Sequence, residues 1–305
     1  MTHEIASQIE QFVTYVAPGR TLASSRDIEA KLLKVFSALN GHPITRPVLT
    51  GWLLKELREV GKAPATVLQY QKALNQFLRW RAETEGSPDI VLRLRLEINK
   101  RKVCITEEDY KALRARLEHP MAPWFYGYHW PYAIRMAWYT GMRLGDCSQC
   151  RWDYLDVDRK ILSFTPQKTS RHAVKLEIPL PTEFLTWLME YKAQQPPSEY
   201  MAPTMAKLYL KRMEHRMVQK TKGKLYKTNE YSTDLGVQFN ALRDSAGVDK
   251  GKTFHAFRHG IVTRLLARGL PPALISMITG QSVATVLEYN SGPQLETLQK
   301  ALGYT

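Results

Sequence analysis

The sequence has few cysteines, no long apolar run and fewer acidic than basic residues. Its three cysteines, Cys104, Cys147 and Cys150, are too few for a disulfide framework. Cys147 and Cys150 have the spacing of a redox motif or of half a zinc site. No second pair completes a metal site, so we predict that both are small apolar core residues.

The lack of a signal peptide and of a long apolar stretch disfavours secretion and membrane insertion. The sequence shows no signal peptide and no apolar stretch long enough to span a bilayer. We therefore expect a cytoplasmic protein with no membrane partner, which agrees with the scarcity of cysteine.

Acidic residues are the third shortage. The 305 residues include 43 Lys and Arg against 29 Asp and Glu, a formal net charge of +14. Such an excess favours association with a polyanion, nucleic acid first, although a merely soluble basic protein would show it too. The length is sufficient for two domains.

Apolar residues recur at helical spacing in four segments of the first 85 residues. The expected helices cover 5–16, a segment ending at 39 and capped by Ser24 or Ser25, 45–57, and 65–85. Four amphipathic helices with short connections form a small bundle.

Basic residues lie on or beside the fourth expected helix. They include Lys62, Lys72 and Arg79. They either contact DNA phosphates or form a solvated polar face, and the sequence leaves both open.

A basic linker is expected after the bundle. It contains Arg101 and Lys102 and ends before Thr106, where a capping residue followed by three carboxylates starts a new helix. The predicted organisation is a helical domain over 1–97, a linker over 98–105 and a second domain over 106–305.

Two positions early in the second domain carry candidate chemistry. Gly141 allows a tight turn, and Arg143 then opens a helix with Asp146 three residues on; this arginine is either structural or directed at a ligand. Further on, β-prone segments flank a polar turn and predict an antiparallel hairpin with Lys168 at or near its tip. A lysine at such a tip is usually just solvated.

Residues 205–228 form the most basic stretch of the chain. Its cations include Lys211, Arg212, Lys220, Lys222 and Lys224, with tyrosines interleaved. This composition fits a surface that contacts the phosphate backbone, and it also fits a mobile charged loop.

Two imidazoles and a guanidinium occur within five residues at His255, Arg258 and His259, and Tyr289 follows downstream. Packed donors and positive charge indicate a phosphate site, and a nearby phenol can be a nucleophile. The histidines also have the spacing of a zinc pair, but no third ligand is evident. Tyr289 is alternatively a core aromatic.

Arg143, Lys168, the His255–His259 motif and Tyr289, in this order, resemble the tyrosine recombinase (phage-integrase-like) family. The stretch from Tyr139 to Asp146 is similar to the family's first arginine box, with aspartate where glutamate is common. Residues 65–80 resemble the last long helix of its core-binding domain.

The resemblance implies a fold that is mainly α: an N-terminal four-helix (SAM-like) bundle, then an α+β catalytic domain that is helical with a small antiparallel sheet. It implies site-specific recombination through a 3′-phosphotyrosyl link and a Holliday junction, of integrase or resolvase type. No metal or other cofactor is implied.

The resemblance also implies a role for each residue. Tyr289 is the nucleophile, Arg143 and Arg258 hold the phosphate, His255 is the candidate base and Lys168 the candidate acid. His259 would support the pocket.

One position departs from the pattern. Gln281 stands where the family usually has histidine or tryptophan, and it lies one residue closer to Tyr289 than expected. Glutamine still donates a hydrogen bond to a phosphate oxygen. The departure keeps open an alternative, a catalytically silent DNA-binding regulator with the same fold.

The implied partners are a double-stranded DNA site and further copies of the chain. Leu295, Leu298 and Leu302 form an apolar stripe on a short terminal helix, which is stable only when docked. We expect a dimer or tetramer on DNA, assembled through this helix, in a bacterial, archaeal or phage or mobile-element context. Since the first helix starts near residue 5, no additional arm-binding domain is expected.

Overall fold

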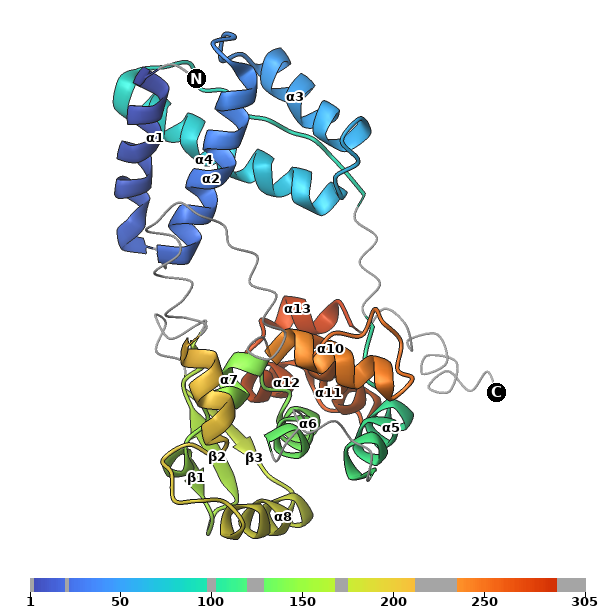
Figure 1. The fold of residues 1–305 in the computed structure, drawn as a ribbon. Helices are drawn as coiled ribbons and strands as arrows, with labels where there is room; N and C mark the ends of the chain where they lie inside the picture. The colour runs from blue at the N-terminus through green and yellow to red at the C-terminus, as the bar shows by residue number, and fades with distance from the viewer. Residues whose placement is uncertain are drawn as a thin grey trace. The chain divides into compact units, whose positions relative to one another are not determined.

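The computed structural model describes residues 3–19, 22–97, 103–119, 129–167, 175–211 and 235–289. The chain divides into two compact units, Met1–Lys100 and Arg101–Thr305 (Figure 1). The predicted linker residues Arg101 and Lys102 lie outside the described residues.

The first unit is a four-helix bundle. Its helices are α1 (His3–Val16), α2 (Leu22–Leu39), α3 (Arg46–Arg58) and α4 (Pro64–Glu85), with a 3-10 turn at Ala17–Gly19 after α1. Aromatic rings fill its core: Phe77 of α4 meets Phe12 edge-on at 5.5 Å and Phe36 at 5.4 Å between ring centroids.

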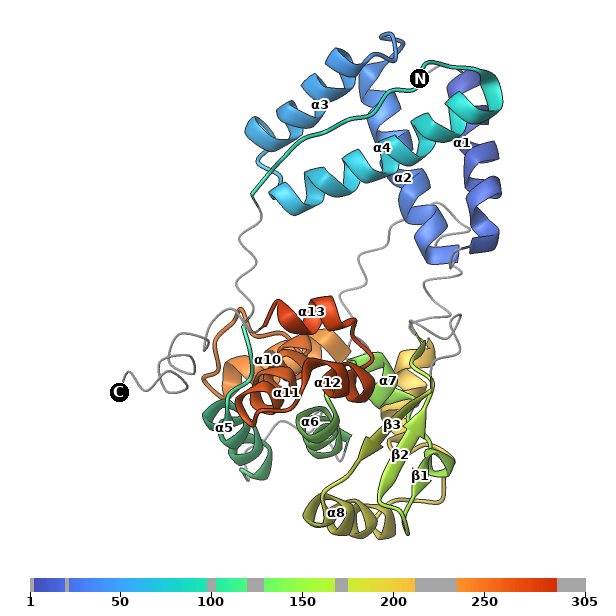
Figure 2. The same ribbon diagram turned by 180° about the vertical axis from the view of Figure 1, so that it is seen from behind.

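One local expectation for this unit needs correction. Ser24 and Ser25 lie inside α2, which begins at Leu22, so neither caps that helix. After α4, residues 86–97 run back along that helix (Figure 2). The side-chain amide of Asn75 exchanges two hydrogen bonds with the backbone of Leu92, at 2.9 and 2.8 Å, and thereby holds the segment there.

The second unit is helical with one small sheet. Its elements are α5 (Glu107–Glu118), α6 (His129–Thr140), α7 (Leu144–Ser148), a 3-10 turn (Trp152–Tyr154), β1 (Leu155–Asp156), β2 (Ile161–Phe164), β3 (Leu176–Pro179), α8 (Thr182–Ala193), a helical stretch over 203–211, α10 (Leu235–Ser245), α11 (His255–Ala267), α12 (Pro272–Thr279) and α13 (Val283–Leu287).

The sheet contains the predicted hairpin. Its strand order is β1-β2-β3, and both pairs are antiparallel, with Leu162 of β2 opposite Ile178 of β3. Together the bundle, the helical second unit and this sheet confirm the predicted fold class. Thr106 also caps α5 as expected, in a capping box with Asp109.

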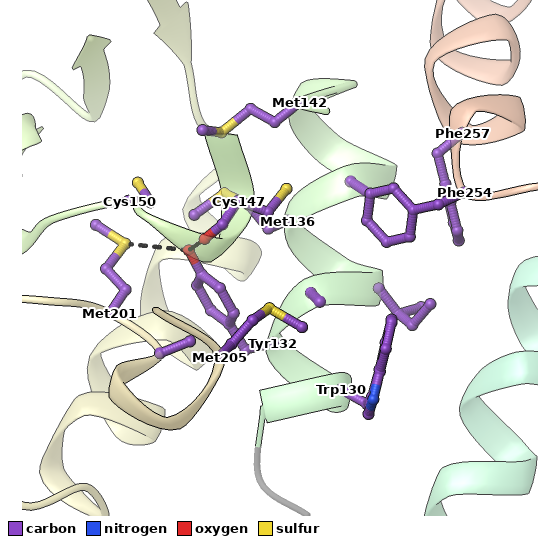
Figure 3. Close-up of a cluster of buried hydrophobic side chains, with 14 of the residues drawn as sticks. Trp130, Tyr132, Met136, Met142, Cys147, Cys150, Met201, Met205, Phe254 and Phe257 are labelled. Carbon is purple, nitrogen blue, oxygen red and sulfur yellow. Dashed lines mark hydrogen bonds between the residues drawn. The ribbon is translucent and has the colours of Figure 1, made fainter. Parts of the chain in front are cut away.

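Helix α6 is the centre of the second core. Trp130, Tyr132 and Met136 are fully buried. Phe254 packs against Trp130 with 6.3 Å between ring centroids, and Phe257 belongs to the same cluster (Figure 3). The Tyr132 hydroxyl donates to the carbonyl of Cys147 at 3.2 Å. This packing fixes α6, and therefore the turn that follows it, against α11.

Cys147 and Cys150 lie in this core, as predicted, with 0% and 1% of their surface exposed. Burial raises the pKa of both thiols, that of Cys150 to about 12. Both thiols are therefore poor nucleophiles, which argues against a redox role for Cys147 and Cys150. Among the described helices, none is both long enough and apolar enough to cross a bilayer.

Candidate active site

Arg258 is the buried centre of the site, with 3% of its surface exposed. It lies in the second turn of α11, and its guanidinium reaches two distant backbone carbonyls. Nη1 donates to Gly141 at 3.1 Å, and Nη2 donates to Thr279. Arg258 thus joins the turn after α6 to the end of α12.

The Arg258 guanidinium stays charged although it is buried. Burial, and then the positive charge of Arg143, lower its pKa to about 10, so the group stays protonated near neutral pH. Its buried Nε finds no hydrogen-bond acceptor among the described residues. A buried donor without an acceptor is costly, and an anionic oxygen at this position would relieve that cost.

Arg143 is the N-cap residue of α7 and follows the glycine turn that ends α6. Gly141 has φ +65°, and a Cβ there would lie 2.6 Å from the side chain of Ile261, so only glycine lets the turn approach α11 this closely. The Arg143 guanidinium lies 3.7 Å from the Asp146 carboxylate. At that distance the ion pair is loose, so the guanidinium can also bind a second, anionic partner.

The hairpin loop begins beside the same helix. The backbone N–H of Gln167 donates to Asp146 at 3.0 Å. Asp146 therefore contacts both Arg143 and the residue that precedes Lys168. Lys168 itself lies outside the described residues.

Two histidines of α11 and Tyr289 form a row of rings. His255 and His259 meet edge-on with 4.8 Å between centroids, and His259 meets Tyr289 at 5.1 Å. His259 Nδ1 lies 3.0 Å from the carbonyl of Val103. Since a carbonyl only accepts, Nδ1 carries the proton, and in the neutral ring Nε2 is then an acceptor.

Tyr289 follows the short helix α13 and is half-buried. Burial raises its pKa, whereas a hydrogen bond from Gln281 and the charge of Arg258 act in the opposite direction. Gln281 follows Gly280, which ends α12 at φ +62°, and Ser282 then caps α13 by accepting from Thr285 N–H at 3.2 Å.

Within the described ranges, no three His, Cys, Asp or Glu side chains gather where a metal ion would bind. The His255 and His259 pair accordingly has no third zinc ligand there. Tyr231 and Tyr304 are two other phenols that could compete with Tyr289 as nucleophile, but neither follows a phosphate-binding motif in the sequence, and both lie outside the described residues.

The candidate DNA contacts of the first unit differ in their surroundings. Lys62 lies 2.7 Å from Glu56, which also binds Lys34 at 3.1 Å, so its charge is already engaged. Lys72 and Arg79 are exposed on α4 and are seven residues apart, which places them on one face two turns apart. These two remain candidates for phosphate contact.

Lys211 is exposed at the end of the helical stretch over 203–211. The rest of the basic segment lies outside the described residues, and so does the terminal stripe. The positions concerned are Arg212, Lys220, Lys222, Lys224, Leu295, Leu298 and Leu302.

Proteins of a known family resemble this chain in sequence. A sequence model of the phage integrase family matches residues 104–296, which hold Arg143, the α11 motif and Tyr289. The chain belongs to the phage integrase family of tyrosine recombinases. The resemblance stated from the sequence is thereby confirmed.

Solved structures share the fold of this family member at low sequence identity. The Tn1549 transposon integrase in complex with transposon right end DNA is 14% identical, with 98% of each chain covered and a TM-score of 0.70. The XerH site-specific recombinase bound to a palindromic difH substrate is 15% identical (97% of this chain, 84% of that one, TM-score 0.64). The lambda integrase tetramer bound to a Holliday junction is 18% identical (93% and 76%, TM-score 0.61). Comparison with curated protein sequences gives no match.

Sequence reasoning missed several supports of the site. The carbonyl of Val103 and the backbone of Ile105 contact α11, where Ile105 N–H donates to Ala256 at 3.0 Å and Gly260 provides the close approach. The Ser276 hydroxyl holds the carbonyl of Gln281 at 2.6 Å. Backbone acceptors have no sequence signature, so no pattern would have identified them.

Proposed function

We propose that this protein is a site-specific DNA recombinase that cuts and rejoins strands through a phosphotyrosyl intermediate at Tyr289. The observation that carries the proposal is the half-buried Tyr289 packed against His259, at 5.1 Å between ring centroids, on the helix that also holds the buried Arg258. Perturbed groups gathered in this way are typical of catalytic sites.

Two guanidiniums serve the transition state. As Tyr289 Oη bonds to phosphorus, negative charge grows on the non-bridging oxygens of the phosphate. Arg258 offers a buried donor to one such oxygen, and Arg143 lies near enough to act on the charge of Arg258. Fixed donors in a site shielded from water stabilise this charge better than water does.

Proton transfer needs a base and an acid. Burial raises the pKa of Tyr289, so the phenol requires a proton acceptor, and His255 is assigned that role. The P–O5′ bond breaks as the P–Oη bond forms, and Lys168 is assigned to protonate the leaving 5′-oxygen. Attack by a 5′-hydroxyl of another strand reverses both transfers and releases Tyr289, so the energy of the phosphodiester is retained.

Gln281 and His259 are assigned supporting roles. Gln281 donates to the tyrosine oxygen and so partly replaces the histidine or tryptophan usual at this position. His259 packs edge-on against Tyr289 and limits the directions that the phenol can take.

DNA binding and assembly complete the proposal. The bundle is assigned to core-DNA binding, with Lys72 and Arg79 facing phosphates, and Lys211 marks the start of a second basic surface. On DNA the protein is proposed to form dimers and tetramers around a Holliday junction, with the C-terminal helix docking on a neighbouring copy. Truncation after residue 289 tests the last point: complexes that assemble unchanged on DNA in size-exclusion chromatography would refute it.

The catalytic proposal is tested with a library of nicked DNA duplexes of randomised sequence. A nick near the cleavage point lets a short product diffuse away and traps the covalent complex. We expect an adduct that survives detergent, that carries DNA on Tyr289 and that is lost in Tyr289→Phe. Sequencing the attached DNA would identify the site.

The alternative is a DNA-binding regulator with the same fold that does not turn over. It is favoured by Gln281 and by the raised pKa of Tyr289. Tight, salt-dependent binding of enriched duplexes, with no adduct on any of them, would support the regulator and refute the enzyme. Binding alone does not distinguish them.

A further inference from the structure

Tyr209 lies outside the family motifs, yet it contacts the residue that precedes Lys168. Its hydroxyl donates to the side-chain carbonyl of Gln167 at 3.0 Å. The two residues are 42 positions apart, and Tyr209 comes from the helical stretch over 203–211.

Gln167 is held from a second direction by α7. Its backbone N–H donates to Asp146 at 3.0 Å, and its side-chain N–H donates to Gln149 at 3.3 Å. Gln149 in turn donates to the carbonyl of Gly145 at 3.3 Å. The backbone and the side chain of Gln167 are therefore both hydrogen-bonded to α7 or to its C-cap residue, Gln149. Arg143 is the N-cap residue of the same helix.

Gly145 shows that this contact depends on a close fit. A Cβ at this position would lie 2.8 Å from the Tyr209 hydroxyl oxygen, so the absence of a side chain makes room for the tyrosine. Gly145 does not have a positive φ, so its backbone conformation is open to any residue. The requirement for glycine at this position is steric and comes from Tyr209.

We infer that Tyr209 and Gln149 are positioning residues that hold Gln167, the residue directly before Lys168, against the Arg143 helix. The inference rests on the proposed function, in which Lys168 protonates the leaving oxygen. Lys168 follows Gln167 directly in the sequence, and Gln167 is fixed by three hydrogen bonds. Because those bonds are near the surface, each contributes modestly, and we expect a partial loss of rate when one is removed.

The test separates placement of the acid from general stability. Adduct formation is measured in single turnover on a recovered site with either an ordinary 5′-oxygen or a 5′-bridging sulfur at the cleaved bond. A thiol has a pKa near 8.5, far below that of an alcohol, so a thiolate leaves without a proton donor. A defect in the acid is therefore rescued by sulfur, and Lys168→Ala provides the benchmark.

Tyr209→Phe is expected to slow adduct formation about 3- to 10-fold on the oxygen substrate and less than about 2-fold on the sulfur substrate. Gly145→Ala should give the same pattern by displacing Tyr209, while retaining a residue that favours helix. Tyr191→Phe is the matched control, since its buried hydroxyl makes no hydrogen bond to the described residues, and its rates should be unchanged on both substrates.

Equal slowing of Tyr209→Phe on both substrates would overturn the inference, because it would indicate a structural role only. Wild-type rates on both substrates would overturn it too. In either case the proposed function would stand. Failure of the wild-type protein to form an adduct that depends on Tyr289 would instead refute the proposed function, and the inference with it.

Discussion

Replacing Arg258 by lysine should loosen the two turns that this arginine joins. The guanidinium fork donates to Gly141 and Thr279 at once, and a single ammonium cannot face both carbonyls. One buried carbonyl is left without its charged donor. The cost is about 1–3 kcal/mol of local stability, since hydrogen bonds to charged groups contribute about 1.5–3 kcal/mol.

Hydrogen exchange with mass spectrometry measures this effect within the full chain. Good reporters are the amide of Gly280, bonded to Ser276 at 2.7 Å, and that of Gly141, bonded to Ala137 at 2.9 Å. Local opening easier by about 1–3 kcal/mol accelerates their exchange about 5- to 150-fold, because about 1.4 kcal/mol is a factor of ten. Peptides from the first unit should exchange as in the wild type.

Arg264→Lys is the matched control on the same helix. Arg264 donates to the carbonyl of Trp138 at 2.6 Å and stacks over its ring at 3.4 Å, so both of these contacts are made with α6. Its replacement should therefore alter exchange around Trp138 and leave residues 276–282 unaffected. Unchanged exchange at 276–282 in Arg258→Lys, or an equal change in both variants, would refute the assignment of Arg258 as the link between these turns.

Three further predictions concern packing and ionisation. Gly141→Ala should lower the stability of the second unit by about 1–3 kcal/mol in urea denaturation, because its Cβ would overlap Ile261 at a positive φ. Burial alone would raise the pKa of Glu56, but hydrogen bonds from two lysines lower it overall, so Glu56→Gln should destabilise the first unit at pH 7. That difference should shrink as the pH falls below about 4.3, where the unfolded carboxyl protonates; a constant difference would contradict the pairing. Cys147 and Cys150 should resist a thiol reagent at pH 8 in the native state and react after denaturation. Cys104, which is partly exposed, should react in both the native and the denatured state.

The sequence predicted the parts of this protein that depend on nearby residues. Helical periodicity located the bundle, and a threonine followed by carboxylates located the start of α5, because helix formation and capping involve residues within a few positions. The α11 motif also follows from spacing, since His255, Arg258 and His259 are three and four residues apart and share one helical face. The order of motifs then identified the family.

The sequence did not predict how these parts support one another. The sequence indicated that Arg258 belongs to a phosphate site, but it did not show that this side chain is buried and donates to carbonyls 117 and 21 residues away. The linker residue Val103 contacts His259 across 156 positions, and Tyr209 contacts Gln167 across 42. Local preference determines which residues are helical, whereas close packing of whole elements decides which distant backbone groups meet. Such contacts form only in the folded chain, and so only the tertiary structure assigns Arg258 its two carbonyls, Tyr289 its neighbours and Gly145 its steric role.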